Sequence, residues 1–323
     1  MGENTDTIME KRQLGATDLH VYPITFGGNV FGWTLDEKKS FEILDGFTGA
    51  GFNFIDTADV YSRWAPGNEG GESETIIGNW MKQKKNRKDI VLTTKVGSDM
   101  GSGKQLKKAY ILEAVEKSLK RLQTDYLDLY QTHFDDLDTP VQETLEAYDQ
   151  LIKEGKVRWI GASNMSAERL KESLETAVAH GLPEYQTFQP HYNLYERKAF
   201  EETLEPICLG HNLGVLNYYS LESGFLTGKY RTKADLGKSP RGADMDKYFN
   251  ERGLRILAAL DTVAAEYKTT QATVALAWLI ARPSVTAPIV SATSLSQLDA
   301  IIKAPELVLG EETLRMLTTA SAW

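Results

Sequence analysis

Residues 52–61 read Phe-Asn-Phe-Ile-Asp-Thr-Ala-Asp-Val-Tyr. The apolar, β-prone start of this stretch is typical of a buried parallel strand. The predicted strand ends at Asp56, and Tyr61 follows five residues later. A carboxylate at the end of a buried strand is costly unless a cation or a reaction requires it there. The stretch therefore predicts a strand whose carboxyl end carries a functional group.

Short apolar runs of this kind alternate along the chain with longer segments of helical period. Eight strand–helix units with right-handed crossovers close naturally into a (β/α)8 TIM barrel, so we predict this α/β fold as a single domain over residues 1–323. A doubly wound open sheet is the alternative. That fold would need a Gly-x-Gly-x-x-Gly turn after its first strand, and residues 26–32 (Phe-Gly-Gly-Asn-Val-Phe-Gly) do not supply one. The predicted strands are 21–26, 52–56, 90–95, 127–133, 157–163, 187–190, 215–218 and 287–290.

Three further features complete the predicted barrel. Residues 12–20 contain a Gly-Ala-Thr-Asp turn and predict an N-terminal hairpin. The longest irregular stretch, 231–248, follows the seventh strand, and because long loops in compact domains are often functional, we regard it as a candidate lid. Apolar residues at helical spacing predict buried helix faces. Two such stripes are Ile111, Val115, Leu119 and Leu122, and Leu254, Leu257, Leu260 and Ala264.

Composition limits the classes of function. The chain has 323 residues and a net charge of -9, which argues against a nucleic-acid surface because phosphate binding needs clustered Lys and Arg. The single cysteine, Cys208, excludes an internal disulfide and fits a reducing compartment. The polar, acidic N-terminus does not have the pattern of a signal peptide, and no apolar run approaches the roughly 18 residues of a membrane span. We therefore expect a soluble, cytoplasmic protein without membrane partners.

Titratable side chains of different kinds end three consecutive predicted strands. Asp56, followed by Tyr61, ends the second strand, Lys95 the third and His133 the fourth. In a barrel, the chemistry sits at the carboxyl ends of the strands. Each residue alone has an ordinary structural explanation, such as a turn aspartate or a hydrogen-bonded core histidine. Those explanations do not predict all four side chains on one rim, so we predict a catalytic quartet.

The quartet suits the protonation of a carbonyl oxygen. Tyrosine is a weak acid with an unperturbed pKa of about 10. A lysine ammonium about 4 Å away, at an effective dielectric of about 20, contributes about 4 kcal/mol, or at most roughly three pKa units. Asp56 would keep Lys95 charged, and His133 could donate a hydrogen bond to the oxygen on which charge develops. Nothing here resembles a nucleophile or a metal cluster, so a cofactor must supply the hydride.

Several motifs resemble those of the aldo-keto reductase superfamily, in its long-chain bacterial type, over about residues 14–312. Residues 54–61 match the family's Asp…Tyr motif, 93–96 (Thr-Thr-Lys-Val) its lysine motif and 130–133 (Tyr-Gln-Thr-His) its histidine motif. The segments 161–164 (Gly-Ala-Ser-Asn) and 218–230 (Tyr-Tyr-Ser-Leu-Glu-Ser-Gly-Phe-Leu-Thr-Gly-Lys-Tyr), with Gln189, match its cofactor motifs.

The resemblance implies a barrel that binds NADP(H), or sometimes NAD(H), and reduces aldehydes or ketones. It implies that Tyr61 is the general acid, tuned by Lys95 and Asp56, and that His133 orients the carbonyl. It also implies that a tyrosine stacks beneath the nicotinamide while three polar side chains hold its carboxamide. The stacking tyrosine is Tyr218, and the polar side chains are Ser163, Asn164 and Gln189. The other implied cofactor-binding residues are Gly28, Ser220, Leu221, Gly224, Ser291, Thr293 and Gln297.

The chain departs from the family pattern at its cofactor motifs, among them Ala300 and Ile301 in place of the Glu-Asn pair usually associated with the adenine. Tyr219 and Ser220 replace the usual Ser-Pro after the seventh strand. Thr293 stands where a cation for the 2′-phosphate is common, although Ser294 and Gln297 predict a helix N-terminus whose backbone N–H groups suit a phosphate. Gln297 has an alternative role as a capping residue only. We favour NADP(H), and the cations that could substitute are Lys229, Arg231 and Arg241.

The leading hypothesis is an NAD(P)-dependent oxidoreductase that interconverts a carbonyl and its alcohol. Trp33, Trp64 and Phe134 follow the first, second and fourth strands, and an aromatic-walled pocket suits bulky or ring-containing carbonyls. Trp64 could equally pack under its own loop. One alternative is a cofactor-binding regulatory subunit that resembles channel β-subunits and has little turnover. A lyase or isomerase that uses Lys95 as a Schiff-base nucleophile is another.

Overall fold

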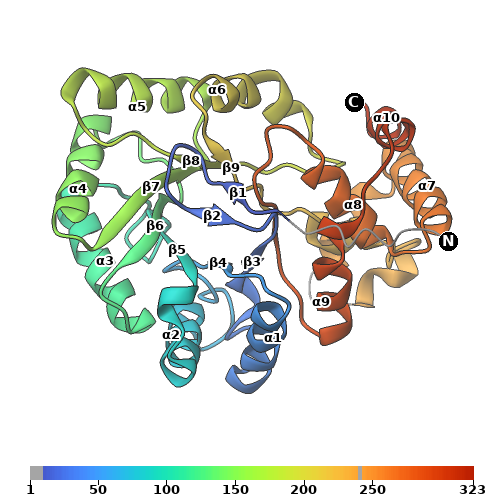
Figure 1. The fold of residues 1–323 in the computed structure, drawn as a ribbon, viewed down its shortest axis with the longest axis horizontal. Coiled ribbons are helices and arrows are strands. Elements are labelled where there is room, and N and C mark those ends of the chain that lie inside the picture. Colours follow the sequence, from blue (N-terminus) through green and yellow to red (C-terminus); the bar gives the residue numbers. More distant parts are fainter. Residues whose placement is uncertain (1–9, 239–241) are drawn as a thin grey trace.

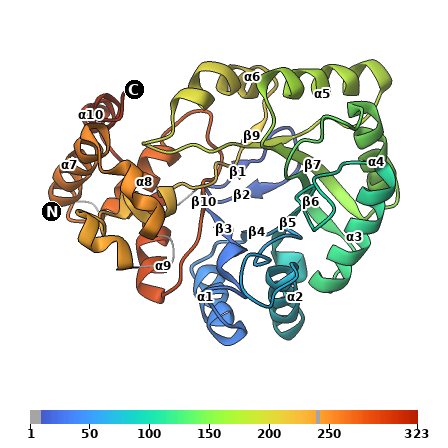
Figure 2. The same cartoon turned by 180° about the vertical axis from the view of Figure 1, so that it is seen from behind.

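The fold is a ring of parallel strands surrounded by helices (Figures 1 and 2). The computed structural model describes residues 10–238 and 242–323. Eight strands pair in the order β10-β3-β4-β5-β6-β7-β8-β9, all in parallel. Their bounds are β3 (Thr25–Gly27), β4 (Phe54–Asp56), β5 (Val91–Val96), β6 (Leu127–Thr132), β7 (Val157–Ser163), β8 (Thr187–Gln189), β9 (Gly214–Val215) and β10 (Ile289–Val290).

Backbone hydrogen bonds join the last two strands and close the ring. Thr286 N donates to Val215 O at 2.9 Å, and Ile289 N donates to Asn217 O at 2.9 Å. An open doubly wound sheet would leave these two strands apart, so the predicted (β/α)8 barrel is confirmed.

Helices pack around the outside of the strands. The helical stripe that begins at Ile111 is confirmed, because its four residues are buried. The stripe that begins at Leu254 is wrong at its first member, since Leu254 is 48% exposed where the helix starts at the surface. Within residues 10–238 and 242–323, no helix combines the length and apolar character that a membrane crossing needs. The helices are α1 (Glu37–Gly49), α2 (Glu72–Lys84), α3 (Lys108–Leu122), α4 (Val141–Lys153), α5 (Ala167–His180), α6 (Glu205–Gly210), α7 (Glu251–Glu266), α8 (Gln271–Ile280), α9 (Leu295–Ile302) and α10 (Glu311–Ala320).

The predicted N-terminal hairpin closes the amino-terminal end of the barrel. Its strands β1 (Arg12–Gln13) and β2 (His20–Val21) are antiparallel and lie across the middle of the ring in Figure 1. Leu14 and Leu19 from the hairpin pack with Phe54 and Leu129 inside the barrel. This apolar plug fills the amino-terminal end of the barrel interior.

Several predicted strand boundaries differ from those of the structure, most clearly in the first and seventh predicted strands. Residues 21–26 were expected to form one strand, but Val21 belongs to the hairpin and the barrel strand starts at Thr25. The seventh predicted strand, 215–218, is regular only to Val215, but its pairing continues beyond that residue: Leu216 N donates to Phe188 O at 3.0 Å and Tyr218 N donates to Pro190 O at 2.9 Å. The buried side chain of Asn217 donates to Tyr192 O at 2.8 Å.

The stretch 231–248 is more regular than expected. It contains two short 3-10 helices, η5 (Lys233–Lys238) and η6 (Gly242–Tyr248). Residues 239–241, among them Arg241, lie outside the described residues. The other short helical segments are η1 (Gly28–Val30), η2 (Arg87–Asp89), the π-helix η3 (Phe200–Leu204), η4 (Glu222–Thr227) and η7 (Ala304–Glu306). Closure of this stretch over a ligand remains a prediction.

Candidate active site

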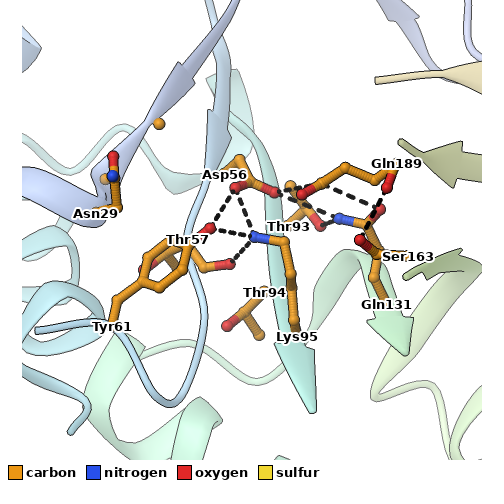
Figure 3. A network of polar contacts seen from close by, with 12 residues as sticks. Asn29, Asp56, Thr57, Tyr61, Thr93, Thr94, Lys95, Gln131, Ser163 and Gln189 are labelled. Carbon is orange, nitrogen blue, oxygen red and sulfur yellow. Dashed lines mark hydrogen bonds and ion pairs between the residues drawn. The ribbon is translucent and has the colours of Figure 1, made fainter. Parts of the chain in front are cut away.

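Three members of the predicted quartet, Asp56, Tyr61 and Lys95, meet at the open end of the barrel (Figure 3). Successive side chains in a strand point to opposite faces, so Lys95 at the end of β5 and Gln131 on β6 both project inward. They face each other in the strand register. Asp56, at the end of β4, is the third inward group of this layer and is completely buried.

The ammonium group of Lys95 is the centre of the site. Its Nζ donates to Asp56 Oδ2 at 2.6 Å, to Thr57 O at 2.7 Å and to Tyr61 Oη at 2.9 Å. These three acceptors use the three N–H donors of an ammonium. Burial lowers the pKa of Lys95 below its ordinary value, while the Asp56 carboxylate opposes that effect. The expected charged partner of Asp56 is therefore present, and a cation touches the phenol oxygen.

Two glutamines hold the other oxygen of Asp56. Gln189 Nε2 donates to Asp56 Oδ1 at 3.1 Å, and Gln131 Nε2 donates to the same atom at 3.3 Å. Gln131 also donates to Thr93 Oγ1 at 2.9 Å. Gln131 was not among the predicted site residues, although it lies two positions before His133 and so shares its face of the strand.

His133 is an uncharged ring beside the phenol. Burial, together with the charges of Lys95 and Lys104, lowers its pKa well below the ordinary value. The ring stacks on Phe134, with 4.8 Å between centroids, and lies edge-on to Tyr61 at 5.9 Å. Its Nδ1 is buried and has no hydrogen-bond partner among the described residues. A neutral imidazole with an unused nitrogen is thus available next to Tyr61.

Polar side chains after β7 and β8 form a chain of hydrogen bonds. Tyr218 Oη donates to Asn164 Oδ1 at 2.9 Å, and Asn164 Nδ2 donates to Ser163 Oγ at 3.0 Å. Ser163 Oγ donates to Gln189 O at 2.8 Å. The structure therefore brings together the four residues expected to surround a nicotinamide. The side-chain amide of Gln189 is directed at Asp56, so it also belongs to the Asp56–Lys95 network.

Other predicted cofactor residues line the rim with mixed roles. Ser220 Oγ is buried and donates to Ile289 O at 2.7 Å, so its hydroxyl serves the fold. Ser291 Oγ donates to the carbonyl oxygen of Gly27 at 2.7 Å; Gly27 is the last residue of β3, and Gly28 follows it. Leu221 is half-buried and precedes η4. Gly224, inside η4, has a φ of 99°, which favours glycine.

The start of α9 is already capped by its own side chains. Ser294 Oγ accepts from Gln297 N at 3.2 Å, and Gln297 Oε1 accepts from Thr293 N at 2.8 Å. The capping role of Gln297, which the sequence left as an alternative, is therefore present. A phosphate at this helix end would find some of the backbone donors in use.

The candidate cations for a 2′-phosphate differ in their surroundings. Arg231 binds Asp261 through both terminal nitrogens, at 2.7 and 2.8 Å. Lys229 Nζ lies beside Gly224, 3.0 Å from where a β-carbon would be. Arg241 is outside the described residues.

Aromatic side chains lie beside the Tyr61 phenol and beside the His133 ring. Trp64 lies edge-on to Tyr61, at 6.0 Å between ring centroids, and edge-on to Trp33 at 5.7 Å. Phe134 lies on the other side against His133, with Lys104 Nζ 4.4 Å from its ring centroid. Trp64 is 48% exposed, so it does not lie buried beneath its own loop. Two of the predicted substrate residues, Trp64 and Phe134, thus lie against Tyr61 and His133, and Trp33 packs against Trp64.

A second buried acidic group, which was not predicted, lies behind Lys95. Asp59 N donates to Lys95 O at 3.4 Å, and its Oδ1 is buried without a hydrogen-bond partner among the described residues. The neighbouring Glu74 accepts from Thr94 Oγ1 and from Arg121 Nε, each at 2.6 Å. Burial, and then the Glu74 charge, raise the pKa of Asp59 to about 8.

The sequence is similar to known proteins over nearly its whole length. The family model described as "Aldo/keto reductase family" matches residues 23–322. The chain is 37% identical to the "Uncharacterized oxidoreductase YrpG" of Bacillus subtilis, over 96% of this chain and 95% of that protein. It is 33% identical to a "Probable voltage-gated potassium channel subunit beta" of Arabidopsis thaliana, over 93% and 92%. It is 34% identical to "Aldo-keto reductase YhdN" of Bacillus subtilis, over 91% and 86%.

Proposed function

This chain belongs to the aldo/keto reductase family, and from that premise we propose that it is an NAD(P)(H)-dependent oxidoreductase that interconverts an aldehyde or ketone with its alcohol. One observation carries the proposal. The Lys95 ammonium lies 2.9 Å from Tyr61 Oη and 2.6 Å from Asp56 Oδ2, and both Lys95 and Asp56 are fully buried.

In the proposed mechanism, Tyr61 gives its phenolic proton to the carbonyl oxygen during reduction. The ammonium of Lys95 stabilises the phenolate that remains, because opposite charges attract strongly in a site shielded from water. Asp56, held by Gln131 and Gln189, keeps that ammonium charged and in place. The neutral His133 donates a hydrogen bond to the same carbonyl oxygen and aligns it with Tyr61.

The residues present fit a nicotinamide dinucleotide. Tyr218 offers a half-buried ring face, and Asn164, Ser163 and Gln189 offer amide and hydroxyl groups beside it. The cofactor, when bound, supplies the hydride that these side chains cannot provide. Lys229 supports a preference for NADP(H), because its ammonium lies next to the Gly224 turn while Arg231 is paired with Asp261.

Replacement of Tyr61 by phenylalanine tests the mechanism. We expect Tyr61→Phe to lower kcat by about a thousandfold or more, since general acid catalysis contributes about 10²–10⁴. The dissociation constant of the cofactor should stay within about twofold. A matched control is Tyr126→Phe, because Tyr126 precedes β6 at the opposite end of the barrel and stacks under Arg87. Equal activity of Tyr61→Phe and the wild type would exclude the proposed role of Tyr61.

The substrate side of the site favours bulky or ring-containing carbonyls. Trp64 lies against Tyr61 and is backed by Trp33, and Phe134 lies against His133. We expect kcat/KM to be higher for aromatic aldehydes than for short aliphatic aldehydes. Trp64→Ala should reduce that preference.

A second candidate function is a cofactor-binding regulatory subunit. It is favoured by the 33% identity with a plant protein named as a potassium channel subunit beta. The complete quartet favours the enzyme. Slow or absent turnover with a broad panel of carbonyls, combined with tight cofactor retention, would support the regulatory alternative. The lyase alternative is disfavoured because Lys95 is fully buried and its donors are already used.

A further inference from the structure

The ring of Tyr218 is covered on one face by His191. The two rings are stacked, with centroids 5.2 Å apart and planes 22° apart. The backbones of these residues form a parallel bridge just beyond the ends of β8 and β9. At the far end of its ring, Tyr218 donates its hydroxyl proton to Asn164. One face and the hydroxyl of Tyr218 are thus fixed, and Tyr219 lies edge-on to the same ring at 5.2 Å between centroids.

A buried carboxylate holds His191 in this position. His191 Nε2 lies 2.8 Å from Glu222 Oε2, and Glu222 is only 2% exposed. The same carboxylate accepts hydrogen bonds from Asn193 Nδ2 and from Tyr248 Oη, at the end of η6. Burial opposes ionisation of Glu222, but the hydrogen bonds from His191, Tyr248 and Asn193 prevail and lower its pKa. Glu222 is therefore an ionised anchor shared by three segments.

The loop that carries Glu222 is strained. Tyr219, Glu222 and Ser223 have φ values of 54°, 45° and 53°, in the left-handed region that side chains other than glycine rarely adopt. Such strain persists only where the surroundings hold the backbone in place, and it is concentrated at functional sites. The hydrogen bonds of the Glu222 side chain provide that support.

We propose that the His191–Glu222 pair is a positioning element for the nicotinamide ring: Glu222 fixes His191, and His191 fixes Tyr218 as a rigid platform. This inference rests on the proposed function, because it assumes that a nicotinamide stacks on Tyr218. His191 and Glu222 are positioning residues, since they act through Tyr218.

The proposal makes a specific statement about which part of the cofactor is affected. The pair contacts the ring of Tyr218, whereas the cation proposed for the phosphate, Lys229, lies beside Gly224. Loss of the pair should therefore weaken the binding of the nicotinamide half and leave the adenosine half nearly unchanged. General support of the loop would instead affect both halves.

The test compares whole and partial cofactors by fluorescence titration of the free protein. The probes are NADPH and NADH, and the matching fragments without nicotinamide, 2′,5′-ADP and ADP. His191→Ala should raise the Kd of the preferred dinucleotide about tenfold, since an ordered aromatic stack contributes about that much. His191→Phe, which keeps a ring, and Glu222→Gln, which keeps the shape, should raise it about threefold. Fragment Kd values should change less than twofold.

Tyr192→Phe is a matched control. Tyr192 is the next residue after His191, but its hydroxyl donates to Glu201 at 2.7 Å, away from Tyr218. This variant should leave every Kd unchanged. Should His191→Ala fail to fold, the two near-isosteric variants decide the question.

Three results would count against the proposal. Equal weakening of dinucleotide and fragment would assign the pair to loop support alone. Unchanged dinucleotide Kd values in all three variants would overturn the inference and leave the proposed function standing. A wild-type protein that binds neither dinucleotide would overturn the proposed function, and this inference with it.

Discussion

The substitution Asp59→Asn should stabilise this protein, by an amount that depends on pH. Asp59 is buried, one of its oxygens has no hydrogen-bond partner among the described residues, and Glu74 lies nearby. Its pKa is raised from 3.8 to about 8, against the attraction of Arg121 and Lys95. Asparagine has nearly the shape of the neutral acid and does not ionise.

The sign follows from the proton that the folded state retains. Below pH 3.8 Asp59 is protonated in both the folded and the unfolded state, so it does not lower the free energy of unfolding. Between pH 3.8 and pH 8 the unfolded chain releases the proton and the folded chain keeps it, so the free energy of unfolding falls as pH rises. At pH 7 the accumulated cost is at most about 4 kcal/mol, from about 1.4 kcal/mol for each pH unit. Above pH 8 the cost is constant.

Thermal unfolding from pH 5 to pH 9 measures this effect. The Tm of Asp59→Asn should exceed that of the wild type by about 6 °C at pH 7, given an unfolding entropy of about 2 cal/mol/K per residue. The difference should be smaller at pH 5 and reach its maximum above pH 8. The exposed Asp125 gives a control, Asp125→Asn, for which we expect little change in Tm. A difference that is negative, or equal at all pH values, would refute the reasoning.

Other substitutions test the packing of the barrel interior and the cofactor preference. Gly161→Ala should lower the free energy of unfolding by about 1–3 kcal/mol, because its β-carbon would lie 2.0 Å from Thr187 Oγ1. Adding Thr187→Ala should restore part of that loss in urea unfolding, and strict additivity would contradict the clash. Gln131→Leu should cost about 1–3 kcal/mol in the same assay, since Asp56 loses a buried donor. Lys229→Ala should raise KM about tenfold for NADPH and little for NADH; equal changes would argue against a phosphate contact.

Much of the barrel and of the quartet was predictable from the sequence. Apolar runs and helical stripes gave the strand order, because parallel strands joined by right-handed crossovers have few possible topologies. Asp56, Lys95 and His133 each end a strand, and the ends of parallel strands meet at one rim. Their proximity therefore needed no knowledge of side-chain positions.

Contacts between loops were not predictable in this way. Glu222 meets His191 and Tyr248 only because a strained turn after β9 points its side chain inward. A glutamate in a loop is normally solvated, so nothing local in the sequence marks it as buried. The capping of α9 by Gln297 is predictable from the sequence as an alternative to cofactor binding, because helix caps depend on residues that are close together in the chain.

The sequence by itself determined the barrel and which residue types stand at its open end, because strand periodicity and chain order are local properties. Only the tertiary structure decided which donor serves which acceptor. Asp56 is held by Gln189, 133 residues away, and Lys95 on β5 reaches Tyr61 in the loop after the neighbouring strand β4. Hydrogen bonds require donor and acceptor within about 3 Å, and distances on that scale are set by packing rather than by position in the chain.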